Sequence, residues 1–558
     1  MPSLVSLKKR LALPKTSWQL CLLAVIGGSV SASLIVLFIF SIRTIQQLYL
    51  SEPDNYNSLA IVSRFDLPII GALVIILFAW FTGYKYLQTG IPFVLNRLKI
   101  AHGIIPMRNT LNQFWGGVVA LSTGFSVGKE GPAIHLGAAC SSYIGGVLRL
   151  PYNSIRTLCA CGIAAGIAAT FNTPVAAVIF VMEVILRDYK VHTFIPVMLA
   201  AIVGSLITSS VFGHAREYEF LQEIALSQEY YLSLVLLGVV LGVLAFLFNR
   251  YLILVIKSSA KLHITVRLII AALITGTLGY AVPHAMGAGL ASLDFSLAHN
   301  LEFDLLLALL IAKLLMTIFA LGLGIPGGII GPILSIGAIA GVCASSIAIG
   351  IIPGEHLSSD FALMGMAGFL AATLNAPLTA LLTVMELSNQ IEIIVPAMIV
   401  ITSASLVSGQ LLNNRSIITM QLDSQKLTYR KPPIERSLQQ VGVIGIMQDK
   451  FDLQVFSVNQ AVTANDESSL STDVPVIINK QQSVTAEFYW QELNSNDGLI
   501  IQHKLIAMSS QTTLDQAYDS LVDKRCGGIY IFDKNPNDIM GFITFEQIRL
   551  YLVKGKLV

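Results

Sequence analysis

The sequence predicts an all-α membrane protein with many membrane-spanning helices, followed by a small soluble α/β domain. Three observations support this fold class. Of the 558 residues, 54% are hydrophobic and only 12% are charged, which is far too apolar for a soluble globular protein. Apolar runs of roughly 20 residues or more recur between Trp18 and Leu412, as transmembrane helices require. Residues 422–558 are polar instead and contain short β-branched runs.

The chain opens with a basic segment, residues 1–16, which the positive-inside rule places in the cytoplasm. The next apolar run, Trp18–Ile42, is too long for the core of a cleaved signal peptide and has no clean cleavage site. We therefore expect it to be a retained first helix. A second helix is expected over about residues 67–86, after the polar loop 51–57.

Two apolar stretches repeat each other about 200 positions apart. Gly162–Val184 and Gly365–Leu387 share Ala-Ala-Thr, Asn, Pro and Val-Met-Glu at an offset of 203. At an offset of 200, the Gly-Pro pair of residues 131–132 recurs at 331–332. These matches indicate an internal duplication, with halves at about 17–215 and 230–420. Duplicated transporter halves commonly meet around a site built from broken helices.

The segment 124–138 contains the strongest candidate for a functional site. It places Lys129 and Glu130 in a long apolar region, where an ionised side chain is costly unless it serves a partner or a water-filled path. Gly131 and Pro132 follow, and Pro is tolerated in the first turn of a helix, so we expect a helix to begin at Glu130. A helix start suits an anion. A carboxylate there can occupy the anion site and leave it when protonated, as a gate does.

The polar C-terminal region is predicted to be an α/β domain over residues 435–558, joined by a linker at 421–434. Three strands and one helix are expected, at residues 474–478, 528–532, 540–544 and 513–522. The runs that begin at Val474 and Gly528 look like two degenerate copies of one strand–turn unit.

Four motifs together resemble the CLC family of chloride channels and proton-coupled chloride exchangers. They are Gly128-Lys-Glu-Gly-Pro132, Thr89-Gly-Ile-Pro92, Gly324-Ile-Pro-Gly-Gly-Ile-Ile-Gly-Pro332 and the paired Asn-x-Pro…Met-Glu segments. The resemblance covers about residues 17–420. It implies a homodimer in a lipid membrane, with one pore for chloride and related monovalent anions in each subunit and two halves of inverted topology. The C-terminal domain resembles a shortened form of the tandem CBS module of many members.

The resemblance also implies the functional residues. Glu130 would be the gate. The anion site would include the Thr89 hydroxyl and the backbone N–H groups of Ile329 and Ile330. The residues expected at the site are Thr89, Gly90, Ile91, Lys129, Gly131, Ile329, Ile330 and Ile418. Ile418 stands where the family has a pore-lining tyrosine, so the inner side of the site is expected to be wider or less selective. Lys129 is either a fixed positive charge in the pore or a helix-end lysine bonded to carbonyl groups.

Val184 is the departure from the family pattern that bears most on mechanism. Exchangers of the family usually have an inner proton-accepting glutamate at this position, directly after Glu183. Val there resembles the channel branch, so we expect a gated chloride channel, with a proton-coupled chloride antiporter as the alternative.

Four other polar residues have structural interpretations. Glu183 and Glu386 occupy equivalent repeat positions, which favours a shared role in capping backbone amides over proton transfer. We interpret His135 as a satisfied core imidazole in preference to a proton relay. Lys313 lies in an apolar run and is expected to have internal partners.

Other classes of function are disfavoured. We find no nucleophile–base constellation and no metal cluster, so we expect neither an enzyme nor a cofactor. A net charge of +2 gives no indication of nucleic acid binding. Nucleotide binding by the tail is also disfavoured, because Gln547 stands where a CBS module usually has an Asp that contacts ribose; a ligand sensor acting through the tail is a third hypothesis. The compact loops suit a prokaryotic plasma membrane, with both termini in the cytoplasm.

Overall fold

The computed structural model describes residues 4–82, 90–213, 228–299, 302–349, 357–427, 432–457, 475–482, 485–493 and 500–554. The chain separates into two compact units. The helical unit comprises residues 21–144 and 157–429, and the tail unit comprises residues 1–20, 145–156 and 430–558.

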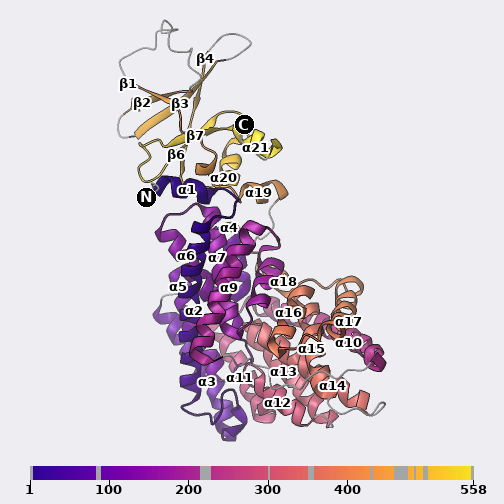
Figure 1. The fold of residues 1–558 in the computed structure, drawn as a ribbon. Helices are drawn as coiled ribbons and strands as arrows, with labels where there is room; N and C mark the ends of the chain where they lie inside the picture. The colour runs from indigo at the N-terminus through magenta and orange to yellow at the C-terminus, as the bar shows by residue number, and fades with distance from the viewer. Residues whose placement is uncertain are drawn as a thin grey trace. The chain divides into compact units, whose positions relative to one another are not determined.

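The helical unit consists of the helices α2 to α18 (Figure 1). In its first half these are α2 (Trp18–Gln46), α3 (Ile61–Phe81), α4 (Gly90–Ile100), α5 (Met107–Ser122), α6 (Glu130–Val147), α7 (Tyr152–Phe171), α8 (Pro174–Phe180) and α9 (Val191–Phe212). The second half contains α10 (Tyr231–Ser259), α11 (Ile264–Ala281), α12 (Leu290–Ala298), α13 (Phe303–Leu323), α14 (Ile330–Ile349), α15 (Leu357–Leu374), α16 (Pro377–Ser388), α17 (Ile394–Ser405) and α18 (Ile417–Ser424). Among the described residues, ten helices are long and apolar enough to cross a membrane, which confirms the predicted membrane protein.

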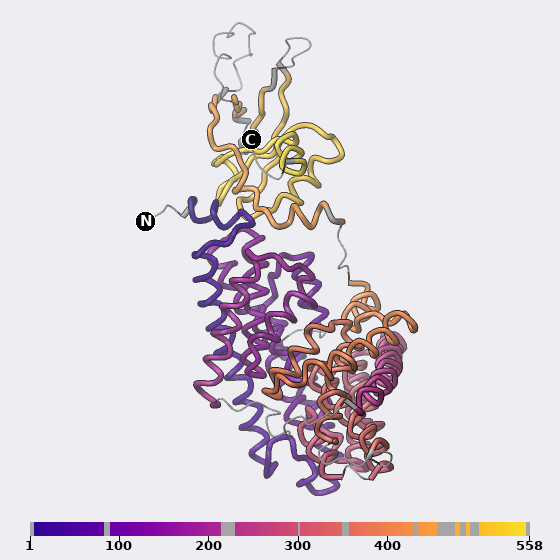
Figure 2. Tube along the Cα trace, turned by 45° about the vertical axis from the view of Figure 1, so that its right-hand side comes forward, coloured from indigo at the N-terminus to yellow at the C-terminus, as the bar shows by residue number. Residues whose placement is uncertain are grey.

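The internal duplication appears as matching helix ends. Helices α6 and α14 begin at residues 130 and 330, and α8 and α16 begin at residues 174 and 377. Asn172 and Asn375, at equivalent positions, both adopt the left-handed backbone conformation, with φ of 56° and 53°. Asn tolerates this conformation, and it ends α7 and α15 just before the next helix starts at a proline. Figure 2 shows the helices of the two halves lying beside one another.

Two predicted boundaries differ from the observed ones. Helix α3 begins at Ile61, six residues before the predicted start, because the chain remains helical through the buried Pro68. It ends at Phe81, and residues 83–89, which include the rest of the predicted helix, lie outside the described residues. Residues 421–424 of the predicted linker form the last turn of α18.

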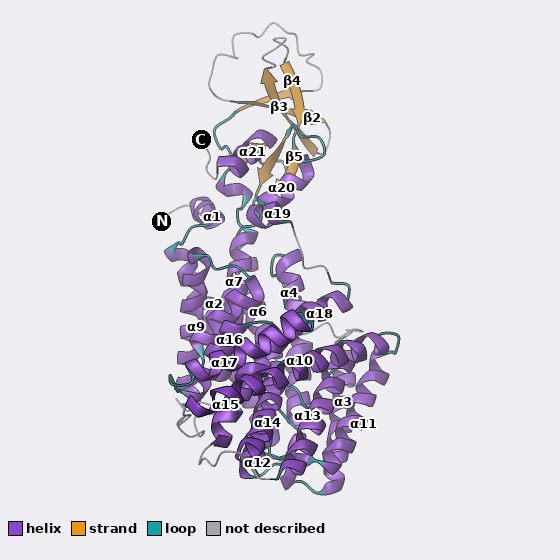
Figure 3. Ribbon diagram, turned by 90° about the vertical axis from the view of Figure 1, so that its right-hand side faces the viewer, coloured by secondary structure: helices purple, strands orange, loops and turns teal. Residues whose placement is uncertain are grey.

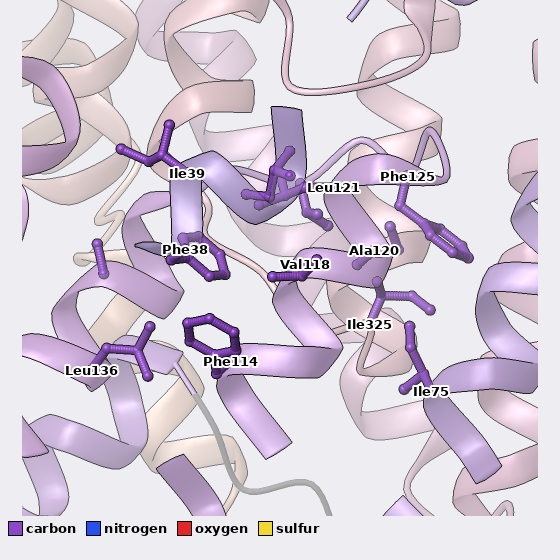
Figure 4. Close-up of a cluster of buried hydrophobic side chains, with 14 of the residues drawn as sticks. Phe38, Ile39, Ile75, Phe114, Val118, Ala120, Leu121, Phe125, Leu136 and Ile325 are labelled. Carbon is purple, nitrogen blue, oxygen red and sulfur yellow. The ribbon is translucent and has the colours of Figure 1, made fainter. Parts of the chain in front are cut away.

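The core of the first half fixes the place where α6 begins. Phe38 of α2 meets Phe114 of α5 edge to face, with ring centroids 5.6 Å apart (Figure 4). One turn along α5, a Cβ added to Gly117 would lie only 2.9 Å from Cγ of Pro132. The absence of a side chain at Gly117 therefore lets α5 pack directly against the first turn of α6.

The tail unit contains the strands of the described chain, drawn in orange in Figure 3. One sheet has the order β1-β2-β3-β4 and the other the order β5-β6-β7. The strands are β1 (Asp452–Ser457), β2 (Val476–Gln482), β3 (Thr485–Leu493), β4 (Ile500–Lys504), β5 (Ile506–Ser509), β6 (Gly528–Phe532) and β7 (Gly541–Thr544). The helices are α1 (Leu4–Ala12), α19 (Pro433–Leu438), α20 (Leu514–Leu521) and α21 (Phe545–Lys554).

The two strands predicted to be copies of one unit occupy equivalent places. Strand β2 pairs in parallel with β1 and antiparallel with β3, and β6 pairs in parallel with β5 and antiparallel with β7. Strand β6 has the predicted bounds. Strands β1, β3, β4 and β5 were not predicted, because polar residues interrupt their apolar patterns.

The N-terminal helix α1 is an integral part of the tail unit. Nζ of Lys8 lies 2.7 Å from the carboxylate of Asp533, and Nζ of Lys9 lies 2.5 Å from that of Asp449. The N–H of Gly442 also donates to the carbonyl group that ends α1. The hydrogen bonds from the two lysines lower the pKa of Asp533 and of Asp449 below their ordinary value of 3.8.

This pairing gives a prediction for the docking of α1. Since the pKa of Asp533 is lower in the folded protein, its contribution is fully present above the ordinary pKa and is lost as the pH falls through the lowered value. We expect Asp533→Asn, or acidification below about pH 4, to speed hydrogen exchange of the α1 amides. The exposed Asp538 in the same turn provides the control Asp538→Asn. Equal exchange rates in all three proteins would contradict the prediction.

Candidate functional site

Two glycine-rich segments, one from each half, meet through their backbones. The N–H of Gly128 donates to the carbonyl of Gly328 at 2.8 Å, and the N–H of Gly328 donates to the carbonyl of Gly128 at 2.6 Å. Helix α6 begins two residues after the first glycine, and α14 begins two residues after the second. This pair of hydrogen bonds therefore brings two helix starts, each with the positive end of a helix dipole, to one place.

The carboxylate of Glu130 lies between these segments. Glu130 is only 1% exposed and is the first residue of α6, as the sequence predicted. A Cβ added to Gly328 would lie 2.6 Å from Oε2 of Glu130, and one added to Gly331 would lie 3.0 Å from Oε1. A Cβ at Gly128 would overlap with the carboxylate. Three glycines thus leave the space that the carboxylate fills.

A cavity of about 320 Å³ borders the same backbone segment. Its lining includes Gly328, which contacts the Glu130 carboxylate. It also includes four of the residues predicted for the anion site, namely Gly90, Ile91, Ile329 and Ile418. These residues come from α4, α18 and the segment before α14, so the structure brings together groups that are far apart in the sequence.

The other predicted site residues have different surroundings. Gly131 packs against the segment before α14, since a Cβ there would lie 2.5 Å from the carbonyl oxygen of Gly327. Ile330 is buried and begins α14. The ammonium group of Lys129 lies 5.4 Å from the ring centroid of Phe171, as a cation–π contact requires. Thr89 lies outside the described residues.

Two cationic residues that the sequence analysis did not single out also line the cavity. Arg267 belongs to α11, and its Nη2 donates to the carbonyl of Gly322 at 3.4 Å. Lys426 follows the end of α18. An arginine in an otherwise apolar helix was the signal that could have revealed the first of them. Positive charge on the wall of a cavity raises the local concentration of anions.

Glu183 caps a helix of the other half. Its carboxylate accepts hydrogen bonds from the N–H of Leu378 at 3.2 Å and from the N–H and hydroxyl of Thr379 at 2.7 and 2.6 Å. These groups belong to the first turn of α16, whose own N-cap residue provides no side-chain acceptor. Such a cap satisfies amides that the helix itself leaves unpaired.

Glu386 forms the mirror-image cap. It accepts hydrogen bonds from the N–H of Val175 at 3.2 Å and from the N–H of Ala176 at 2.8 Å, both in the first turn of α8. The shared capping role predicted from the repeat is therefore confirmed. Each half supplies the carboxylate that the short helix of the other half needs.

Three further predictions concern buried side chains. Lys313 has internal partners, as predicted, since its ammonium donates to the carbonyls of Ala285 and Gly287. His135 is fully buried and stacks on Phe93 with ring centroids 5.5 Å apart. Neither of its ring nitrogens has a hydrogen-bond partner within the described ranges, so its interpretation as a satisfied imidazole was wrong. The stacking on Phe93 holds the ring by packing alone.

The reciprocal caps predict a loss of stability when one is removed. Glu386→Ala leaves two amides of α8 without their acceptor, which costs about 2 kcal/mol. We expect a lower midpoint of thermal unfolding in detergent, with a smaller decrease for Glu386→Gln, whose amide oxygen still accepts. Glu392→Ala, at an exposed position six residues further on, is the control and should leave the midpoint unchanged. An equal effect of the two alanine variants would refute the capping argument.

The sequence model of the family described as "Voltage gated chloride channel" matches residues 70–409. A solved structure of a slow cyanobacterial Cl⁻/H⁺ antiporter is similar, with a TM-score of 0.65 and 22% identity over 73% of this chain and 97% of that one. A CLC-type fluoride/proton antiporter has a TM-score of 0.60 and 22% identity over 72% and 97% of the two chains. A eukaryotic CLC transporter has a TM-score of 0.60 and 18% identity over 95% and 98%. At these identities, the structural likeness establishes the fold.

Proposed function

The chain belongs to the voltage gated chloride channel (CLC) family, and we propose that it is a gated channel that conducts chloride and related monovalent anions down their gradient. It is an integral membrane protein with many membrane-spanning helices. The proposal includes the homodimer that the family resemblance implies, in a prokaryotic plasma membrane with both termini in the cytoplasm.

The choice of a channel rests on one observation: the Glu183 carboxylate, next to Val184, is engaged in capping α16. Exchange coupled to protons usually needs an ionisable group on the inner route, because a bare proton in apolar surroundings is prohibitively costly. The Val184 side chain cannot hold a proton. The carboxylate of Glu183 accepts three hydrogen bonds from the start of α16, each worth about 1.5–3 kcal/mol when the acceptor is charged. Protonating Glu183 would weaken these bonds and the cap with them.

Glu130 would act as the gate by occupying the place of an anion. When charged, its carboxylate is attracted to the two helix starts that meet at Gly128 and Gly328. A proton removes the negative charge and hence the attraction, so the side chain leaves and an anion takes its place. Arg267 and Lys426 would supply that anion by concentrating it in the adjacent cavity.

For the CBS-like C-terminal domain we propose a structural role. The N–H of Thr544 donates to Oε1 of Gln547 at 3.0 Å, and the N–H of Gln547 donates to the hydroxyl of Thr544 at 3.2 Å. These reciprocal bonds cap the start of α21. Gln547, at the position where a CBS module usually contacts ribose, is thus used in holding a helix end.

The rival function is a proton-coupled chloride antiporter, since two of the similar solved structures are described as antiporters. Flux from proteoliposomes with simultaneous pH recording separates the two. For a channel, the reversal potential follows the chloride gradient alone and a pH gradient does not move it. A chloride gradient that drives protons uphill would establish the exchanger instead.

A prediction for the gate concerns Glu130→Gln. This variant mimics the protonated side chain, so we expect faster anion flux at neutral pH and a flat pH profile. Glu302→Gln is the matched control, because Glu302 also stands at a helix start, that of α13, but is exposed. An unchanged flux and pH profile in Glu130→Gln would eliminate the gate.

A further prediction concerns the charged cavity. Arg267→Gln removes one positive charge from its wall, so we expect anion flux to fall about fivefold at low ionic strength and less at high salt, where screening weakens the attraction. Arg250→Gln, on an exposed part of α10, is the control. The same loss of flux at every salt concentration would exclude an electrostatic role.

A further inference from the structure

A short loop between α11 and α12, residues 282–289, is held from one side by Asp54. Oδ1 of Asp54 accepts a hydrogen bond from the N–H of Ala288, and Oδ2 accepts one from the N–H of Gly289, both at 3.0 Å. Asp54 lies between α2 and α3 and is only 9% exposed. Both oxygens of a nearly buried carboxylate from the first half thus bind this loop of the second half, here called the clamp loop.

Lys313 holds the clamp loop through the opposite set of groups. Its ammonium donates to the carbonyl of Ala285 at 3.1 Å and to that of Gly287 at 2.8 Å. Lys313 is completely buried in the middle of α13, where a cation requires compensation by hydrogen bonds and opposite charge. Amides of the loop turn toward Asp54 and carbonyls turn toward Lys313. The two charges therefore fix the direction of the loop's peptide dipoles.

The clamp loop borders the gate. The N–H of Gly287 donates to the carbonyl of Gly124, in the segment that leads into α6, at 3.1 Å. A Cβ added to Gly331 would lie 3.6 Å from the carbonyl oxygen of Ala288 and 3.0 Å from Oε1 of Glu130. The carbonyl of the clamp loop and the carboxylate of the gate therefore contact the same residue of α14.

We propose that Asp54 and Lys313 are positioning residues of the gate, which set the pH at which Glu130 leaves the anion path. The proposal rests on the proposed function, since it needs Glu130 to be the gate. The negative charge of Asp54 and the Ala288 carbonyl disfavour a charged Glu130, whereas the positive charge of Lys313 favours it. Neither Asp54 nor Lys313 lines the cavity, so they act through the clamp loop and their charges.

Other titratable groups lie on the segments packed around the gate and the clamp loop. They are Tyr56, Lys129, His135, Arg267, His284 and Asp294. None of them is removed when Asp54 or Lys313 alone is replaced. A difference in the pH midpoint between single variants therefore belongs to the replaced residue.

The test is the pH dependence of chloride flux from proteoliposomes that contain the full-length protein. Asp54→Asn removes a negative charge, so the midpoint should shift to lower pH by about one unit. Lys313→Gln removes a positive charge, so the midpoint should shift to higher pH by about the same amount. Lys313→Arg keeps the charge and should restore the wild-type midpoint. Glu52→Gln, two residues from Asp54 but exposed, is the control without a shift.

The same replacements in the Glu130→Gln background separate a gate effect from a general loss of structure. With the gate neutralised, Asp54→Asn should no longer alter the pH profile. If Glu130→Gln flattens the profile but Asp54→Asn leaves the midpoint of an assembled protein in place, the gate stands and the positioning proposal is wrong. Shifts of Asp54→Asn and Lys313→Gln in the same direction overturn it as well. If Glu130→Gln leaves the flux and its pH profile unchanged, the gate role of Glu130 in the proposed function is wrong.

Discussion

Unpaired backbone amides inside a membrane cost several kcal/mol each, and the structure of the helical unit follows from how it meets this cost. Helices α6 and α14 both begin at buried residues, Glu130 and Ile330. Gly128 and Gly328 satisfy one amide each by pairing with one another. The remaining amides of the two helix starts favour a negative charge, and the Glu130 carboxylate supplies it. An anion that replaced this carboxylate would meet the same donors, so the proposed gate and the proposed anion site coincide.

The same constraint explains why the two halves depend on each other. The short helices α8 and α16 start at prolines and receive no cap from their own N-cap residues. Glu386 and Glu183 provide the caps across the interface between the halves. A carboxylate that fulfils this role contributes most to stability while it stays charged. Protonation of Glu183 would therefore weaken the cap that it provides for α16.

Local signals account for what the sequence predicted correctly. The Gly-Pro step of residues 131–132 places the start of α6, because proline acts on the backbone within one turn. The duplication was also visible, because identical residues recur at an offset of about 200 positions. Arg267 and Lys426 were missed because they come together only in the folded chain. They line one cavity, but they lie on α11 and just after α18. The role of Asp54 is equally non-local, since its partners lie more than 230 positions away. Contacts between residues so far apart in the sequence leave no local periodicity or spacing from which they could be predicted.

The duplication is symmetric in backbone but not in charge. Gly124 and Gly324 end equivalent helices with positive φ, so at the offset of 200 Glu130 corresponds to Ile330 and Lys313 to Gln113. Two carboxylates at the meeting point would repel one another and shift their own protonation, and the presence of Ile330 in the second half avoids this repulsion. The buried Gln113, whose amide has no hydrogen-bond partner in the part of the chain that the structure describes, is the neutral counterpart of Lys313. The first half thus supplies Glu130 and Asp54, and the second half and the end of α18 supply Lys313, Arg267 and Lys426. The charged side chains around the meeting point of the halves are therefore arranged unequally, although the scaffold is built from two similar parts.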